Sequence, residues 1–178
     1  MDIELLVNIT SKAWSLKILS LLQSGTPGRQ APLLAATKAS RSSFASSMEH
    51  LVQLGLLERN PGHGHPLRPE FRLTPSGKRA AVIAGRVMEN VLDEDAFVVI
   101  RRSWAVPILA VTDVPARFSH IKSELGGISD RALSQSLFVL EERAWLKREI
   151  DVSHRSPFPT YHAVNAGQKI NQAIALNV

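Results

Sequence analysis

The chain has 178 residues, 44% of them hydrophobic, so it can bury either one core or two small ones. It contains no cysteine, which excludes a disulfide framework, a thiol nucleophile and a cysteine redox sensor. Its formal net charge of +5 favours nucleic acid as the partner, because a basic protein attracts polyanions. No apolar run is long enough to span a membrane and no signal-peptide pattern is present, so we expect a cytoplasmic protein without membrane contact.

The first half of the chain predicts several helices followed by a β-hairpin. Ser40 is a good N-cap, because its hydroxyl can accept a hydrogen bond from a free backbone N–H of the next helix. In that helix Phe44, Met48 and Leu51 recur at helical spacing, and Gly55 ends it. We predict helices over residues 3–9, 14–22, 32–39 and 40–54, and strands over 56–60 and 69–73 around a loop at 61–66.

The second half predicts a helix-turn-helix with a wing. Helix 119–125 ends at Gly126-Gly127, and Ser129 is a good N-cap for a second helix with a leucine stripe and a polar outer face. A short helix, a tight turn and a longer helix are typical of the helix-turn-helix. Further elements are two helices within 77–102, strands over 146–152 and 160–164 around a loop at 156–159, and a closing helix over 168–176.

The two halves repeat each other. Trp14 and Ile18 lie 90 positions before Trp104 and Ile108, and Gly77 lies 90 positions before Gly167. The polar and apolar positions of the helix that begins after Ser40 recur 89 positions later, after Ser129. A period held through three helices and a wing indicates a tandem repeat.

The second half contains a series of short stretches at characteristic places: Ser103-Trp104, Ile108-Leu109, Arg117-Phe118-Ser119, Gly127-Ile128-Ser129, Leu133-Ser134-Gln135 and Pro157-Phe158-Pro159-Thr160-Tyr161. Together they resemble the HxlR family of bacterial winged-helix regulators. The resemblance covers roughly residues 102–170, and residues 64–74 of the first half resemble the same family more distantly. Ala144-Trp145 stands where the family usually has a Gly-Leu pair. The resemblance implies that the flanking helices form a dimer-like arrangement, here within one chain.

We therefore predict a mainly α chain with small β wings (α+β), built as a tandem winged helix-turn-helix with domains over 1–90 and 91–178. We expect a transcriptional regulator that reads double-stranded DNA with recognition helices at about 40–54 and 129–143. Basic wing residues should contact phosphates. The expected DNA-contacting residues are Ser40, Arg41, Ser42, Ser43, Ser46, His50, Arg68, Arg72, Arg117, Ser129, Arg131, Ser134, Gln135 and Arg155.

A second function class stays open: a tandem winged helix that docks proteins, for example in chromosome segregation, without sequence-specific DNA binding. Asp130 and Glu141-Glu142, near the second recognition helix, favour this alternative. A small-molecule effector between the domains and a homodimer also stay open. Trp14, Trp104 and Trp145 could line an effector pocket, but large aromatic residues at apolar helix positions are more typical of core.

Two short motifs could suggest other chemistry. Gly62-His63-Gly64-His65 offers imidazoles to a metal, but no cysteine or nearby carboxylate completes a ligand set. Ser119-His120-Ile121-Lys122 matches the Ser-x-x-Lys pattern of serine hydrolases without that pattern's companion motifs. We therefore expect neither an enzyme nor a bound metal or cofactor.

Overall fold

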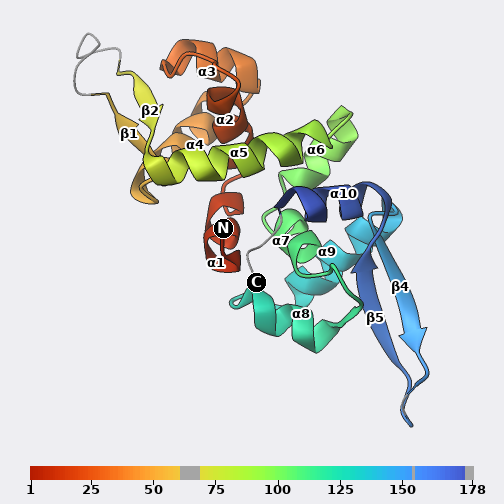
Figure 1. Cartoon of the computed structure of the whole chain (residues 1–178). Helices are drawn as coiled ribbons and strands as arrows, with labels where there is room; N and C mark the ends of the chain where they lie inside the picture. Colours follow the sequence, from red (N-terminus) through yellow and green to blue (C-terminus); the bar gives the residue numbers. More distant parts are fainter. Residues whose placement is uncertain (61–68, 154, 175–178) are drawn as a thin grey trace. The chain divides into compact units, whose positions relative to one another are not determined.

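A computed structural model describes residues 1–60, 69–153 and 155–174. The chain divides into two compact units. The N-terminal unit is Asn8–Glu89, and the C-terminal unit is Asn90–Val178 together with Met1–Val7. Helix α1 (Ile3–Thr10) therefore carries the chain from the second of these units into the first (Figure 1).

The N-terminal unit is a set of helices with a short β-hairpin. Its central helix, α2, packs along α5, and α3 and α4 also contact α2 (Figure 1). Apolar side chains from each helix are buried between them, among them Leu19, Leu33, Phe44 and Leu51. The elements are α2 (Ser15–Gln23), α3 (Gln30–Thr37), α4 (Arg41–Gln53), β1 (Leu57–Arg59), β2 (Phe71–Leu73) and α5 (Pro75–Glu89).

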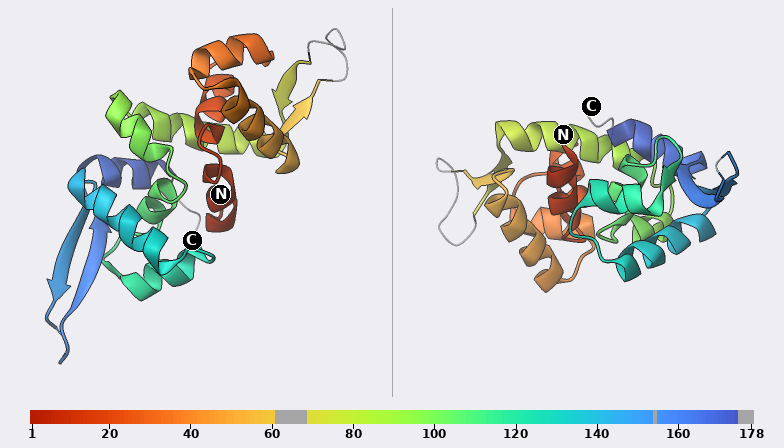
Figure 2. Two further views of the ribbon diagram at one scale, coloured as in Figure 1. Left: turned by 180° about the vertical axis from the view of Figure 1, so that it is seen from behind. Right: turned by 90° about the horizontal axis from the view of Figure 1, so that it is seen from below.

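The C-terminal unit has the same plan with a larger sheet. Its antiparallel strands lie in the order β3-β5-β4, and the β4–β5 hairpin extends away from the helices of this unit (Figure 2). The buried Asn171 side chain of α10 donates to the Leu109 carbonyl at 2.8 Å, which ties α10 to the end of α7. The elements are α6 (Glu94–Ile100), α7 (Ala105–Ala110), β3 (Ala116–Arg117), α8 (Phe118–Leu125), α9 (Asp130–Glu142), β4 (Leu146–Asp151), β5 (Phe158–Ala163) and α10 (Asn165–Ile174).

The two units have the same backbone conformations and close glycine contacts at equivalent positions, so the sequence repeat is also a structural repeat. Trp14 and Trp104 precede α2 and α7 with nearly equal backbone angles, φ −105° and −103°. A Cβ atom on Gly77 would lie 1.9 Å from the Leu56 carbonyl oxygen. On Gly167 it would lie 2.1 Å from the carbonyl oxygen of Trp145. Only glycine lets α5 approach the Leu56 carbonyl, and α10 approach the Trp145 carbonyl, this closely.

Some predicted boundaries were wrong, for local reasons. The loop predicted at 156–159 ends earlier, because Phe158 and Pro159 already belong to β5 and pair with β4. Proline is tolerated there because β3 pairs only with Thr160 and Tyr161, so no third strand lies beside Pro159. The helix predicted over 32–39 instead spans Gln30–Thr37, since Lys38 takes a left-handed conformation with φ 61°. The closing helix begins at Asn165 rather than at 168.

Within the described residues, no single helix is long and apolar enough to cross a membrane. Among the described helices, only α1 and α2 taken together reach the length and apolar composition of a membrane span, and the two helices are bent by 102° at the break between them.

The turn after each long helix provides a test of the repeat. Gly55 (φ 67°) and Ala144 (φ 52°) are both exposed and both left-handed, a conformation that is unfavourable for a residue with a Cβ atom. We expect Ala144→Gly to raise the free energy of unfolding by about 0.5–1 kcal/mol. The converse change, Gly55→Ala, should lower it by about 1 kcal/mol. Urea unfolding measures both, and equal stabilities for Ala144→Gly and the parent would contradict the expectation.

Candidate nucleic-acid interface

Helices α3 and α4 form the helix-turn-helix of the N-terminal unit. Lys38, left-handed, ends α3, and the Ser40 Oγ accepts a hydrogen bond from the Ser43 N–H at 3.2 Å, which caps α4. Phe44 and Leu51 attach one face of α4 to the core. The opposite face of α4 is therefore free to meet a partner.

The exposed first turn of α4 carries a cation and hydroxyl groups. Arg41, Ser42 and Ser43 are exposed, and Arg41 has no ion-pair partner within the described part of the chain. The Ser40 Oγ lies 2.9 Å from the Ser43 Oγ and 3.3 Å from the Ser42 Oγ, so these hydroxyls form one cluster at the helix start. Ser46, one turn further on, is half-buried. An arginine and several hydroxyls are suited to base edges and phosphate oxygens.

His50 makes contacts inside the unit, although the sequence placed it among the DNA-contacting residues. It is half-buried, and its Nε2 lies 2.7 Å from the Asn8 carbonyl oxygen and 3.1 Å from the Ser11 Oγ. These contacts hold the chain between α1 and α2 against α4. The ring therefore positions a neighbouring segment.

Helices α8 and α9 form the second helix-turn-helix. Gly126, with φ 62°, follows α8, and the Ser129 Oγ accepts from the Ala132 N–H at 3.2 Å, as the Ser40 hydroxyl does in the other unit. A leucine stripe on α9 is buried, which leaves the other face exposed. The exposed residues of that face include Arg131, Ser134, Gln135 and Phe138.

The charges at the start of α9 differ from those at the start of α4. The Lys122 Nζ on α8 lies 2.7 Å from Asp130 Oδ1 at the start of α9, so an acidic group neutralises this lysine. Arg131 has no ion-pair partner among the residues described. The second helix-turn-helix therefore presents less free positive charge than the first.

The wings carry basic residues, several of them paired. The Arg72 Nε lies 2.7 Å from Glu58 Oε1 across the β1–β2 hairpin, and both side chains are exposed. On β4, the hydrogen bond and charge of Lys147 lower the pKa of Glu149. Arg155 is exposed between β4 and β5. Arg68 lies outside the described residues, as does the Gly62–His65 motif.

Arg117 lies at the base of the second wing. Its guanidinium carbon is 3.3 Å from the centroid of the Phe158 ring, so the exposed cation stacks on an aromatic face. Arg117 also belongs to β3 and directly precedes α8. The side chain is thus held between the sheet and the helix-turn-helix.

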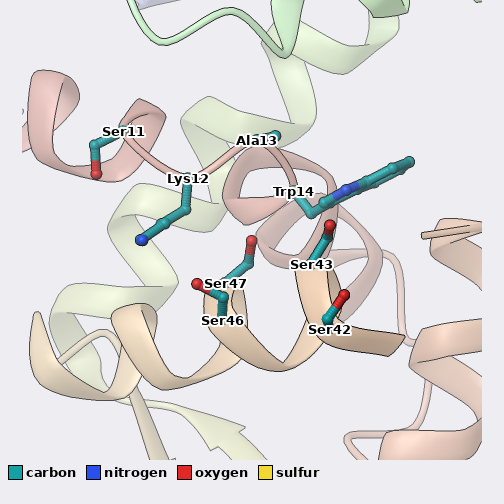
Figure 3. A pocket seen from close by; sticks show the side chains of 8 residues that line it. All are labelled: Ser11, Lys12, Ala13, Trp14, Ser42, Ser43, Ser46 and Ser47. Carbon is teal, nitrogen blue, oxygen red and sulfur yellow. The ribbon is translucent and has the colours of Figure 1, made fainter. Parts of the chain in front are cut away.

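A pocket of about 340 Å³ lies beside α4 (Figure 3). It is formed by the segment between α1 and α2, which includes Lys12, and by serines on α4. Lys12 was not among the residues predicted from the sequence, although the repeat contains a signal: Lys12 precedes Trp14 by two positions, as Arg102 precedes Trp104. The lining residues are Ser11, Lys12, Ala13, Trp14, Ser42, Ser43, Ser46 and Ser47.

Of the two motifs that could suggest other chemistry, Ser119–Lys122 lies within the described residues and Gly62–His65 lies outside them. In the ranges 1–60, 69–153 and 155–174, no group of three or more His, Asp or Glu side chains is arranged to hold a metal ion. Ser119 and Lys122 both lie exposed on α8, and Lys122 is engaged by Asp130. Trp14 and Trp145 are buried, and Trp104 is half-buried.

The His50 contacts lead to a prediction about stability. We expect His50→Ala to lower the free energy of unfolding by about 1 kcal/mol, because it removes a hydrogen bond to the Asn8 carbonyl. His120→Ala is the matched control, since that histidine is exposed on α8. Chemical denaturation compares the two variants. Equal stabilities would show that the His50 contacts contribute nothing.

Comparison with known proteins identifies the family. The model of the HxlR-like helix-turn-helix family matches the chain twice, over residues 9–93 and 99–176, and so confirms the resemblance seen in the sequence. Comparison with curated proteins and with solved structures found no match. The two matched segments together span most of the chain, and each includes one helix-turn-helix and its wing. The chain therefore belongs to the HxlR-like helix-turn-helix family of DNA-binding transcriptional regulators, and the family's pattern occurs twice along it.

Proposed function

We propose that the chain regulates transcription by reading duplex DNA with α4 and α9 as two unequal recognition helices. The observation that carries this proposal is the shared arrangement of their first turns. Each helix begins at a serine cap, is fixed to its core by one apolar face, and exposes an arginine without an ion pair among the described residues, Arg41 or Arg131. An exposed arginine on a major-groove helix can form a bidentate contact with guanine.

The two recognition helices expose different side chains, so their half-sites should differ. The first turn of α4 offers an arginine and hydroxyls, whereas α9 offers Arg131, Ser134 and Gln135 beside the acidic Asp130. Glutamine is suited to adenine, and an aspartate can accept a hydrogen bond from cytosine. The preferred DNA site should therefore be asymmetric.

A second candidate function, protein docking, is favoured by exposed apolar groups in the C-terminal unit. Phe138 on α9 is 63% exposed, Ile150 on β4 is 52% exposed, and Val152 just beyond that strand is 74% exposed. Apolar groups on a recognition helix and a wing are suited to a protein surface as well as to thymine methyl groups. The effector, the homodimer and the domain limits at residue 90 stay predictions.

Selection from a random duplex pool, repeated at two salt concentrations, tests the function. An enriched asymmetric motif, with affinity that falls as salt rises, is the expected result. Weak, salt-sensitive binding with no enriched motif would overturn specific reading and favour protein docking.

The arginines at the two helix starts should contribute specificity. We expect Arg41→Ala or Arg131→Ala to weaken binding to the selected site by about 1–3 kcal/mol and to relax the preference at one base position each. Arg79→Ala is the control, because that arginine lies on α5 and donates to the neighbouring Ser76 hydroxyl at 3.0 Å. Repeating the selection with each variant shows which half-site changes. A variant with the parent's motif and affinity would exclude that arginine as a reader.

Removal of the acidic group at the start of α9 should strengthen binding to random duplex, where Asp130 makes no base-specific contact. Asp130→Asn frees Lys122 from its ion pair and removes a charge that repels phosphate, so we expect tighter binding and a salt slope steeper by about one unit. Asp95→Asn on α6 is a control for the change in net charge. Titrations at several salt concentrations measure the slope. If both variants raise affinity equally, net charge rather than the position of Asp130 decides the effect.

A further inference from the structure

The pocket beside α4 joins two segments that are distant in the sequence. One wall is the chain between α1 and α2, with Lys12 and Trp14, and the other is the first two turns of α4 (Figure 3). The hydroxyls of Ser46 and Ser47 point from α4 toward the segment that carries Lys12 and Ala13 (Figure 3). The pocket therefore gathers an ammonium group and several hydroxyl donors at one place.

Ser47 is the most informative residue of this pocket. Its side chain is only 1% exposed, and it belongs to the lining of the pocket. A serine hydroxyl can donate one hydrogen bond, and in so buried a side chain it can meet an acceptor from outside the protein only through the pocket. Its place in the lining makes this hydroxyl available as a donor to an acceptor that enters the pocket.

The positive charge of the pocket indicates that its ligand is an anion. Lys12 is exposed and has no ion-pair partner among the described residues, and the lining contains no carboxylate. The C-terminal unit has a comparable pocket between α8 and α9, but there Lys122 is paired with Asp130 at 2.7 Å. The pocket of the N-terminal unit is therefore the one with a free cation. One cation with neutral donors is suited to an oxyanion such as phosphate.

We propose that this pocket receives a backbone phosphate of the bound DNA, with Lys12 supplying the charge and the hydroxyls of Ser46 and Ser47 donating hydrogen bonds. The assignment rests on the proposed function. The source of the phosphate follows from position, because the serines lie on the same helix as Arg41 and within two turns of it. A phosphate held there fixes the register of α4 on the duplex and carries no base preference.

The test is a salt titration of Lys12→Gln on both the selected duplex and a random duplex. We expect the variant to bind both duplexes more weakly by the same factor and to reduce the salt slope by about one unit, because one phosphate contact is lost. Lys12→Arg should keep the slope of the parent. Lys78→Gln is the matched control, since Lys78 is an exposed lysine in the first turn of α5 and should leave the slope unchanged.

Ser47→Ala separates a binding role from a structural one. Alanine is smaller than serine and favours the helix, so this change should leave the melting temperature nearly unchanged. If the hydroxyl donates to phosphate, the same variant should lose about tenfold in affinity for both duplexes, the order expected for one hydrogen bond to a charged group.

Three results would overturn the proposal, and they are distinguishable. A parent that binds duplex while Lys12→Gln keeps its salt slope would leave the proposed function intact and reject the phosphate contact. A melting temperature raised by inorganic phosphate in the parent but not in Lys12→Gln, with the slope unchanged, would assign the pocket to a free anion. A parent that binds no duplex would reject both the contact and the proposed function.

Discussion

Each unit depends on one backbone junction, where the long helix, the hairpin and the closing helix meet at a single residue. The Leu56 N–H donates to the Leu51 carbonyl at 3.0 Å, and the Leu56 carbonyl accepts from the Thr74 N–H at 3.1 Å. Gly77 approaches that same carbonyl so closely that no side chain fits. In the other unit Trp145 makes the same pair of hydrogen bonds, at 2.9 Å each. Backbone groups make this junction, so the side chain there can change from leucine to tryptophan.

A junction made by the backbone leaves the exposed faces of α4 and α9 free to diverge. The apolar stripe of α4 or α9 has to match its core, but the opposite face has no such constraint, because water can satisfy its polar groups. The exposed residues of the two helices accordingly differ, while the serine caps have the same hydrogen-bond length of 3.2 Å. The scaffold is therefore repeated along the chain, while the outer faces of its two long helices differ.

The features that sequence could predict are those that depend on near neighbours. Ser40 and Ser129 were recognised as caps because a cap bonds three residues ahead, and the leucine stripe of α9 follows from helical spacing. Pro159 was placed in a loop, because its acceptance in β5 depends on where β3 ends. The place of His50 depends on a carbonyl 42 positions away, at Asn8. Contacts of this kind arise only when distant segments meet, and periodicity does not report them.

Within the proposed function, the difference in free charge assigns different parts to the two units. Electrostatic attraction to phosphate is long-ranged and independent of base sequence, and it acts most strongly where a cation is not already neutralised. The N-terminal unit keeps Lys12 and Arg41 unpaired among the described residues, whereas Asp130 neutralises Lys122 in the other unit. The N-terminal unit should therefore dominate the first encounter with DNA. The C-terminal unit, with Gln135 and the exposed Phe138, should act through short-range contacts that depend on the surface it meets.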